Sequence, residues 1–432
     1  MDSHKQTPII YNLFPRLAGA MPDWLGHVQR AQAMGFNWLY INPIFYPGYS
    51  RSLYAIRHHY QINPLFLPRG AKRDGMAQLE RILREFQDMG LWPMIDLVVN
   101  HTSRDCPLIQ EHPSWYVHGE HGELVSPFVR DVDEPHKMTV WEDLAEIDNS
   151  GSSDREELWN YWAKLVRFYL RLGFKGFRCD AAYKVPAELW RYLVKEAASV
   201  DPDALFFAET LGATERQTLA LGGTGLHYFF NSSKWWDFEQ PWALEQHEKF
   251  GKIAPSISFP ESHDTARLAA DTDGNESVQR QRYAFASVFS AGLMLPIGYE
   301  FGFKEKLDVV YTRPTHWERP TFDIQDFVRR VNLLKLENPL LQGEGTLKIA
   351  KRDGSVLVLE RRTEQALGKV GWVLVNKSWD KHASVNLQDI ADLSPNYRLY
   401  RICRDESPWS GTPLLEQPVM LEQAEVALIL EL

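Results

Sequence analysis

Four short segments of this 432-residue sequence end in polar residues that could do chemistry. They read DLVVNH, GFRCDAA, FAET and FPESHD, and each begins with apolar residues typical of a buried strand. The polar residues that close these segments are Asp96, Asn100 and His101; Arg178 and Asp180; Glu209; and His263 and Asp264. Any one of them could be a satisfied structural group, but the agreement of four strand ends predicts a shared site.

The spacing of Arg178 and Asp180 predicts that both side chains point to one face of their strand, because strand side chains alternate sides. A buried Arg and Asp side by side cost desolvation unless the site needs them. An arginine can keep a neighbouring carboxylate ionised and oriented. The pair therefore suggests a carboxylate that must stay charged in a partly dry site.

The residue types suit cleavage of a glycosidic bond, which needs one carboxylate nucleophile and one carboxylic acid that protonates the departing oxygen. A third carboxylate can bind sugar hydroxyls more strongly in the transition state. Asp180, Glu209 and Asp264 supply the three groups. His101 and His263 suit hydrogen bonds to hydroxyls; the alternative for each is a capped structural histidine.

The elements that would position these residues follow a repeated rhythm of helix, glycine and apolar strand. In DGMAQLERILREFQDMGLWPMIDLVVNH, for example, apolar residues recur at helical spacing before Gly90. Gly35, Gly90 and Gly173 each lie where a helix is expected to end in a left-handed turn. With the later runs, about eight strands are expected, and alternating strands and helices predict a (β/α)8 TIM barrel. A doubly wound sheet is disfavoured, because no glycine-rich phosphate loop follows the first strand.

Three domains are predicted from breaks in this rhythm. The catalytic barrel is assigned to residues 1–101 and 153–342, and a stretch rich in Pro, His and Asp at 102–152 is an insertion after strand 3. Residues 343–432 carry short alternating strands and predict a C-terminal antiparallel β-sandwich.

Composition limits the partners and the location. The net charge of -10 argues against nucleic acid or an anionic membrane as the main partner. The three cysteines show no metal or disulfide spacing, and no secretory signal or membrane-spanning run is visible, so a cytoplasmic location is predicted.

The four segments, in this order, resemble the conserved regions of the α-amylase superfamily, glycoside hydrolase family 13. The resemblance implies a retaining glycoside hydrolase or transglycosylase with Asp180 as nucleophile, Glu209 as general acid/base and Asp264 as transition-state stabiliser. It implies that Arg178, His101 and His263 line the reacting subsite, with an α-glucan or maltooligosaccharide as substrate. The segment SLYAI resembles the one that supplies a stacking aromatic, which makes Tyr54 a substrate-binding candidate; the alternative is a core tyrosine.

Some positions depart from the common family pattern. Tyr183 and Lys184 replace a Lys-His pair after the second region, so Lys184 is a candidate for contacting a sugar hydroxyl or an anionic leaving group; the alternative is a solvated loop lysine. Segments such as LGGTGLHYFFNSSKWW resemble the maltosyltransferases that use maltose 1-phosphate, but those enzymes carry Asn where this chain has Ala181. An α-glucan glycosyltransferase, one using a sugar phosphate included, and a non-catalytic carbohydrate-binding barrel are the alternatives.

No cofactor or resident metal is expected. Asn100 resembles a calcium ligand of some amylases, and Asp131, Asp133 and Asp143 follow it in the insertion. Calcium takes 6–8 oxygen ligands, so one matching residue does not define a site, and a solvated acidic loop is the favoured interpretation.

Overall fold

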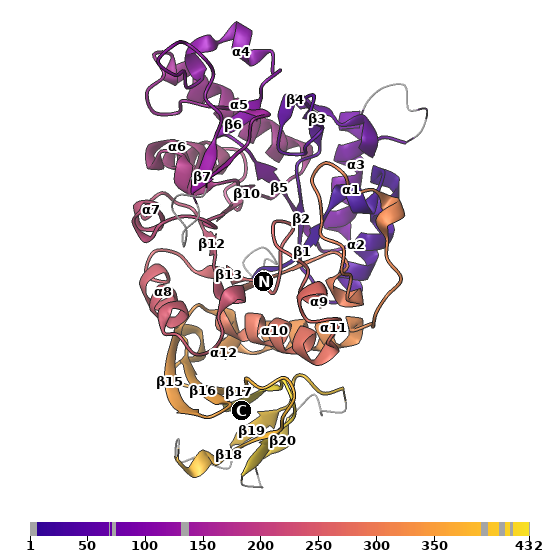
Figure 1. Ribbon diagram of the computed structural model, residues 1–432, viewed down its shortest axis with the longest axis vertical. Coiled ribbons are helices and arrows are strands. Elements are labelled where there is room, and N and C mark those ends of the chain that lie inside the picture. The colour runs from indigo at the N-terminus through magenta and orange to yellow at the C-terminus, as the bar shows by residue number, and fades with distance from the viewer. Residues whose placement is uncertain are drawn as a thin grey trace.

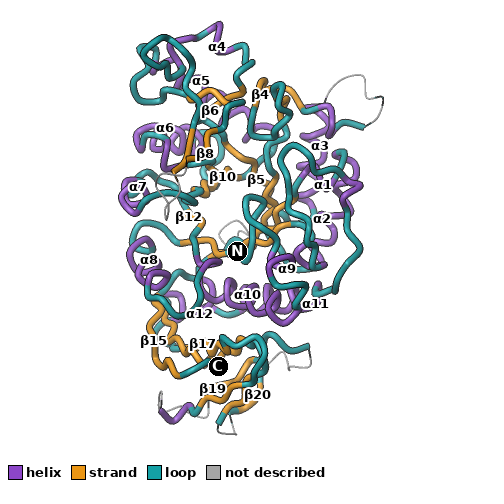
Figure 2. The backbone as a smooth tube through the Cα atoms, viewed as in Figure 1, coloured by secondary structure: helices purple, strands orange, loops and turns teal. Residues whose placement is uncertain are grey.

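The structure is a computed structural model that describes residues 7–68, 70, 75–130, 138–389, 396–405, 411–414 and 418–431. Parallel strands close into a barrel, and Figure 2 shows them ringed by helices. Around the barrel the strands are β1 (Ile9–Leu13), β2 (Trp38–Ile41), β5 (Trp92–Leu97), β10 (Gly176–Cys179), β11 (Leu205–Ala208), β12 (Tyr228–Phe230), β13 (Ser256–Ser258) and β14 (Gly292–Pro296). The predicted (β/α)8 fold is confirmed.

The barrel interior is apolar at its centre and polar at the carboxyl ends of the strands. Trp38, Met94, Phe207 and Ile257 belong to the cluster that fills the interior. Because strand side chains alternate, Asp96 follows Met94 on the inner face. Arg178 lies directly opposite Asp96 in the pairing of β10 with β5. The two charged residues are therefore inner-face neighbours across two adjacent strands.

The outer layer consists of amphipathic helices that cover the barrel wall. The longer ones are α2 (Trp24–Ala33), α3 (Gly75–Asp88), α5 (Arg155–Leu172), α6 (Ala187–Ala198), α7 (Glu215–Ala220), α8 (Trp242–Phe250), α10 (Glu276–Phe289) and α11 (Gln325–Glu337). Shorter ones are α1 (Pro15–Ala18), α4 (Leu108–Glu111), α9 (Leu268–Asp271) and α12 (Pro339–Gln342). Gly173 ends α5 with φ 116° and donates its N–H to Leu170 O, as a left-handed helix end requires.

The chain leaves the barrel after β5 and returns at α5. In between it forms β6 (His101–Ser103), β7 (Phe128–Arg130), β8 (Met138–Val140) and β9 (Leu144–Glu146), which pair as β6 with β9 and β7 with β8. A separate hairpin, β3 (Phe45–Pro47) with β4 (Ile56–Ile62), precedes α3. The predicted limits of the insertion, 102–152, stay a prediction, because strand pairing does not test whether the segment is a folding unit.

The C-terminal region is antiparallel and lies at the opposite end of the molecule from α4 (Figure 1). Its larger sheet has the order β15 (Thr346–Asp353), β16 (Val356–Arg362), β17 (Gly371–Asn376), β22 (Val426–Glu431), β19 (Tyr397–Tyr400) and β20 (Thr412–Pro413). A second sheet pairs β18 (Ala383–Val385) with β21 (Val419–Leu421). Side chains from both sheets share one apolar cluster, Val358 and Leu421 among them. Within the described ranges no helix is long and apolar enough to cross a bilayer.

Candidate active site

Arg178 is the centre of the predicted site. Its Nη1 donates to Asp96 Oδ1 at 2.7 Å and to Asp180 Oδ1 at 2.6 Å. Its Nη2 lies 3.2 Å from Glu209 Oε2 and 3.7 Å from Asp264 Oδ2. One guanidinium, 4 % exposed, thus contacts all three carboxylates that the sequence singled out. The ends of β10 and β11 and the loop after β13 bring these residues together.

Asp96 anchors Arg178 through a buried network of hydroxyl groups. Tyr40 OH and Tyr54 OH donate to Asp96 Oδ2 at 2.5 and 2.8 Å. Asn42 Nδ2 donates to Tyr54 OH at 3.0 Å. Burial raises the pKa of Asp96 to about 6, although Arg178 and the Tyr40 hydroxyl act in the opposite direction. Asp96 therefore has its oxygens occupied by protein donors, which suits a supporting residue.

The backbone around Asp180 positions both it and Glu209. Asn100 Nδ2 donates to the carbonyl oxygen of Asp180 at 3.1 Å. The next residue, Ala181, has φ 40° and ψ 50°, a left-handed conformation that is uncommon for alanine. In this conformation its N–H donates to Glu209 Oε2 at 2.7 Å. The unusual turn thus links the residue after Asp180 to the second carboxylate.

Glu209 has the environment of a carboxylic acid that holds its proton at neutral pH. Burial raises the pKa of Glu209 to about 8; Arg178 lowers it, and the charges of Asp180 and Asp264 raise it further. Asp264 is more open, with 46 % of its side chain exposed against 14 % for Glu209. One buried acid beside carboxylates held by an arginine is the division of roles that acid-assisted bond cleavage requires.

The two predicted histidines and Tyr54 lie against the carboxylates. His263 Nε2 is 2.8 Å from Tyr54 OH and 3.1 Å from Asp264 Oδ2, and its ring stacks parallel to that of Tyr54. His101 Nε2 is 3.2 Å from the carbonyl oxygen of Tyr54. Burial lowers the pKa of His263 to about 4 and lowers that of His101. Both imidazoles are therefore neutral near pH 7 and able to hydrogen-bond hydroxyl groups.

Lys184 lies at the edge of this cluster, against the β7–β8 hairpin. Its Nζ donates to Phe128 O at 2.5 Å and lies 5.5 Å from the Trp141 ring centroid. Burial lowers the pKa of Lys184, while Glu146, Asp180 and Glu209 act to raise it. The structure thus places this lysine between the hairpin and the carboxylates, partly engaged with protein groups.

Sequence reasoning missed Tyr40 and the N–H of Ala181. Tyr40 lies in the apolar run WLYI, whose pattern shows a buried strand and nothing about the hydroxyl. Its contact with Asp96 depends on the pairing of β2 with β5, where Tyr40 is opposite Met94. The sequence does place Tyr40 one residue from the carboxyl end of β2, and a hydroxyl at that position could have been recognised as a candidate for the site.

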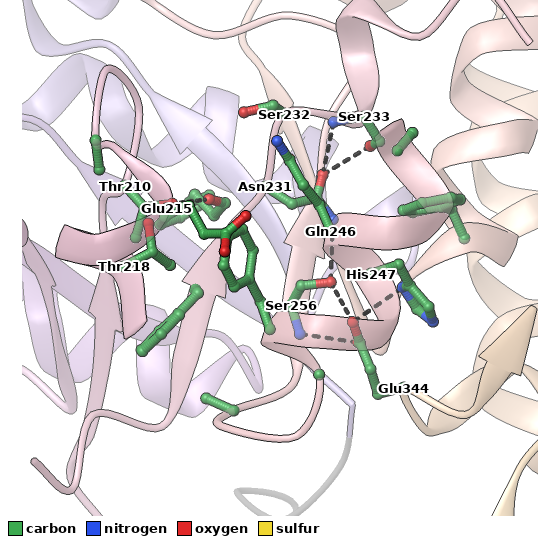
Figure 3. Close-up of a pocket in the computed structure, with 18 of the residues that line it drawn as sticks. Thr210, Glu215, Thr218, Asn231, Ser232, Ser233, Gln246, His247, Ser256 and Glu344 are labelled. Atoms are coloured by element: carbon green, nitrogen blue, oxygen red, sulfur yellow. Dashed lines mark hydrogen bonds and ion pairs between the residues drawn. The ribbon is translucent and has the colours of Figure 1, made fainter. Parts of the chain in front are cut away.

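A small cavity is lined by Arg178, Glu209 and Asp264 together with the apolar residues Phe230, Phe259 and Met294. A different cavity, of about 70 Å³, lies outside the barrel wall near α8 (Figure 3). There Ser256 N and Oγ both donate to Glu344, at 2.8 and 2.5 Å. The lining of this second cavity includes none of the three carboxylates. The hydrogen bonds between Ser256 and Glu344 connect the barrel to the segment before β15.

The calcium hypothesis stays untested. Asp131 and Asp133 lie outside the described residues, and Asn100 is bonded to Asp180. Among the residues that the structure describes, no group of three or more His, Cys, Asp or Glu side chains is arranged to hold a metal ion.

The chain thus combines a (β/α)8 barrel, an insertion after its third strand and an antiparallel C-terminal region with three carboxylates that contact one arginine. A family profile for the glycogen debranching enzyme, glucanotransferase domain, matches residues 7–121. An α-1,4-glucan:maltose-1-phosphate maltosyltransferase of Burkholderia pseudomallei is 25% identical over 371 residues, which are 83% of this chain and 32% of the relative. Alpha-amylase 2 of Dictyoglomus thermophilum is 24% identical over 410 residues, covering 89% of this chain and 68% of the relative.

Solved structures agree on the fold. An α-amylase from Lactobacillus plantarum superposes over 100% of both chains with a TM-score of 0.77 at 19% identity. The chain thus resembles the α-amylase superfamily, its maltosyltransferases included. It spans about a third of the length of the Burkholderia relative.

Proposed function

We propose that this protein cleaves α-glucosidic bonds with retention of configuration, and that its substrate is an α-glucan or a maltooligosaccharide. The observation that carries the proposal is the contact of one buried guanidinium with Asp180, Glu209 and Asp264. Asp180 contacts Nη1 of Arg178 and Glu209 contacts Nη2 of the same side chain. Contact with one guanidinium favours the short separation between the two carboxyl groups of a retaining pair, about 5–5.5 Å.

In this mechanism Asp180 attacks the anomeric carbon while Glu209 gives its proton to the departing oxygen. A covalent β-glycosyl ester with Asp180 forms and the sugar leaving group departs. Glu209, now ionised, takes a proton from water or from a second sugar hydroxyl, which attacks the same carbon and releases Asp180. Arg178 holds Asp180 in place through the hydrogen bond from its Nη1 to Asp180 Oδ1. In the proposed mechanism Asp264, His101 and His263 hold hydroxyls of the reacting sugar.

Transfer to a second sugar is the alternative outcome of the same chemistry. The relatives named maltosyltransferase favour it, as does the glucanotransferase description of the matched profile. The two outcomes differ only in which hydroxyl attacks the glycosyl-enzyme.

The test is product analysis of the full chain incubated with maltoheptaose, maltose, glycogen or trehalose, each with and without phosphate. Early NMR spectra should show products of the α configuration, and longer oligosaccharides would identify transfer. Asp180→Ala should lower turnover by orders of magnitude while the circular dichroism spectrum stays the same. Products of β configuration, or normal turnover in Asp180→Ala, would refute the proposal.

A further inference from the structure

A large cavity lies beside α1, and its lining includes none of the three carboxylates. It has a volume of about 560 Å³, within the usual range for small-molecule pockets, ~300–1,000 Å³. Its walls come from α1, from the 3₁₀ turn Pro64–Phe66 and from the loop between β14 and α11, which passes beside α1 (Figure 1). The residues that matter for its chemistry are Pro15, Arg16, Pro22, Leu65, Arg313 and Pro314.

Arg16 is part of the wall of this cavity, and two donors of its guanidinium lack acceptors. Its side chain is 2 % exposed, and its Nη2 donates to Arg51 O at 2.5 Å. Its Nε and Nη1 have no hydrogen-bond partner among the residues that the structure describes. A buried guanidinium without a counter-charge is costly, so such a group is normally paired with an anion.

Arg313 adds a second positive charge to the wall of this cavity. Arg313 is half-buried and lines the same cavity, with its Nη1 donating to Val310 O and Thr312 O. Burial lowers the pKa of Arg16 to about 10, and the charge of Arg313 acts in the same direction.

Two acids lie close by, but both accept hydrogen bonds from backbone amides. Asp23, which also lines the cavity, accepts from Ala20 N at 3.2 Å. Asp308, whose charge acts to raise the pKa of Arg16, accepts hydrogen bonds from Val310 N and Tyr311 N at 2.7 Å each. Neither acid forms an ion pair with Arg16 in the described part of the chain.

We propose that this cavity binds the oxyanion of a small organic molecule, a phosphate or a carboxylate, between Arg16 and Arg313. Guanidinium groups recognise both oxyanions through paired hydrogen bonds. The cavity is much larger than a bare ion, and its proline and leucine walls provide apolar contact for the ligand's body. The site is separate from the bond-cleaving cluster and does not depend on the function proposed for it.

The test is calorimetric titration of the full chain, at constant ionic strength, with glucose 1-phosphate, glucuronate, inorganic phosphate and glucose. The two sugar oxyanions share a ring and differ in the charged group, so their order of affinity separates phosphate from carboxylate recognition. We expect at least one of them to bind saturably and more tightly than inorganic phosphate, and glucose not to bind at this site.

Arg16→Met should lower the affinity for the tighter-binding ligand by about tenfold or more, because hydrogen bonds between the guanidinium and the oxyanion are lost. Arg313→Gln, at a half-buried position, should weaken it as well. The control is Arg362→Gln. Arg362 is an exposed arginine on β16 that does not line the cavity, so this substitution should leave the affinity unchanged.

Affinity equal to wild type in Arg16→Met, or no saturable binding of any oxyanion, would overturn the proposal. If Arg16→Met does not fold, unchanged affinity in Arg313→Gln overturns it instead. Inorganic phosphate binding as tightly as both sugar oxyanions would overturn the claim that the ligand is organic.

Discussion

At the scale of single residues, the pKa of Glu209 leads to a pH prediction. Burial raises this pKa to about 8, so the carboxyl is protonated below that pH and loses its proton above it. Because the acid form donates to the leaving group, kcat/KM should fall as pH rises through about 8. The measurement is the pH profile of kcat/KM with maltoheptaose.

The matched variant for this prediction is Glu209→Gln. Its activity on natural substrates should drop by ~10²–10⁴-fold, the usual contribution of a general acid. On an aryl glycoside whose leaving group needs no proton, formation of the glycosyl-enzyme should survive and show no alkaline limb. If the fall of activity at alkaline pH persists in Glu209→Gln, the group that titrates near pH 8 is not Glu209.

Ala181 gives a second prediction, about stability. Its left-handed backbone, φ 40°, costs an alanine ~1–2 kcal/mol, whereas asparagine tolerates this region better. Ala181→Asn should therefore raise the free energy of unfolding by about 0.5–1 kcal/mol. Urea denaturation measures it, with Ala181→Val as a control that should lower stability. No gain in Ala181→Asn would show that the turn is not strained.

At the scale of elements, the sequence predicted the helices and strands better than the contacts between them. The apolar spacing in residues 75–88 identified α3, and Gly90 and Gly173 have the positive φ expected at helix ends. These are local features, set by periodicity and backbone conformation. The carboxylates could be predicted to meet because the strand ends of a barrel share one edge.

The remaining site contacts depend on register and loop conformation, which no local pattern specifies. Tyr40 reaches Asp96 only because β2 and β5 pair with Tyr40 opposite Met94. The N–H of Ala181 reaches Glu209 only because of the left-handed turn. Lys184 was identified from the sequence, but its contact with Phe128 depends on how the insertion folds back.

The β7–β8 hairpin gives a prediction about substrate length. Phe128 and Trp141 are about 40 % exposed beside Lys184, at the edge of the carboxylate cluster. Aromatic faces of this kind suit stacking with sugar rings beyond the reacting one. Trp141→Ala should raise KM for maltoheptaose by about three- to tenfold and leave maltose little changed.

The control for the hairpin prediction is Trp379→Ala. Trp379 is 43 % exposed and lies in the C-terminal region, so its loss should change neither KM. Equal effects of Trp141→Ala on maltose and maltoheptaose would mean that the hairpin acts on the reacting subsite and not on distant sugar units.

At the scale of the whole molecule, buried charges join the barrel to the C-terminal sheet. Lys335 on α11 donates to the carbonyl oxygens of Ser287, Ser290 and Leu341, which all lie on the barrel side of the junction. Glu344 accepts from Ser256 beside the cavity of Figure 3. Because the bond between Ser256 and Glu344 links β13 to the segment that leads into β15, the barrel and the sheet share a polar junction and are expected to unfold together.

Arg361 on β16 offers the sharpest test of that junction. Its guanidinium is buried and donates to Leu340 O at 2.7 Å and to Gly343 O at 2.5 Å, in the connection between the two regions. Arg361→Leu leaves these carbonyls without their donor, so the free energy of unfolding should fall by about 2–4 kcal/mol in denaturant titration. Its neighbour Arg362 is half exposed and pairs with Glu360, so Arg362→Leu should change stability by no more than ~0.5 kcal/mol. Equal losses in the two variants would mean that the junction contributes no more than an ordinary surface ion pair, and that the sheet is not held to the barrel in this way.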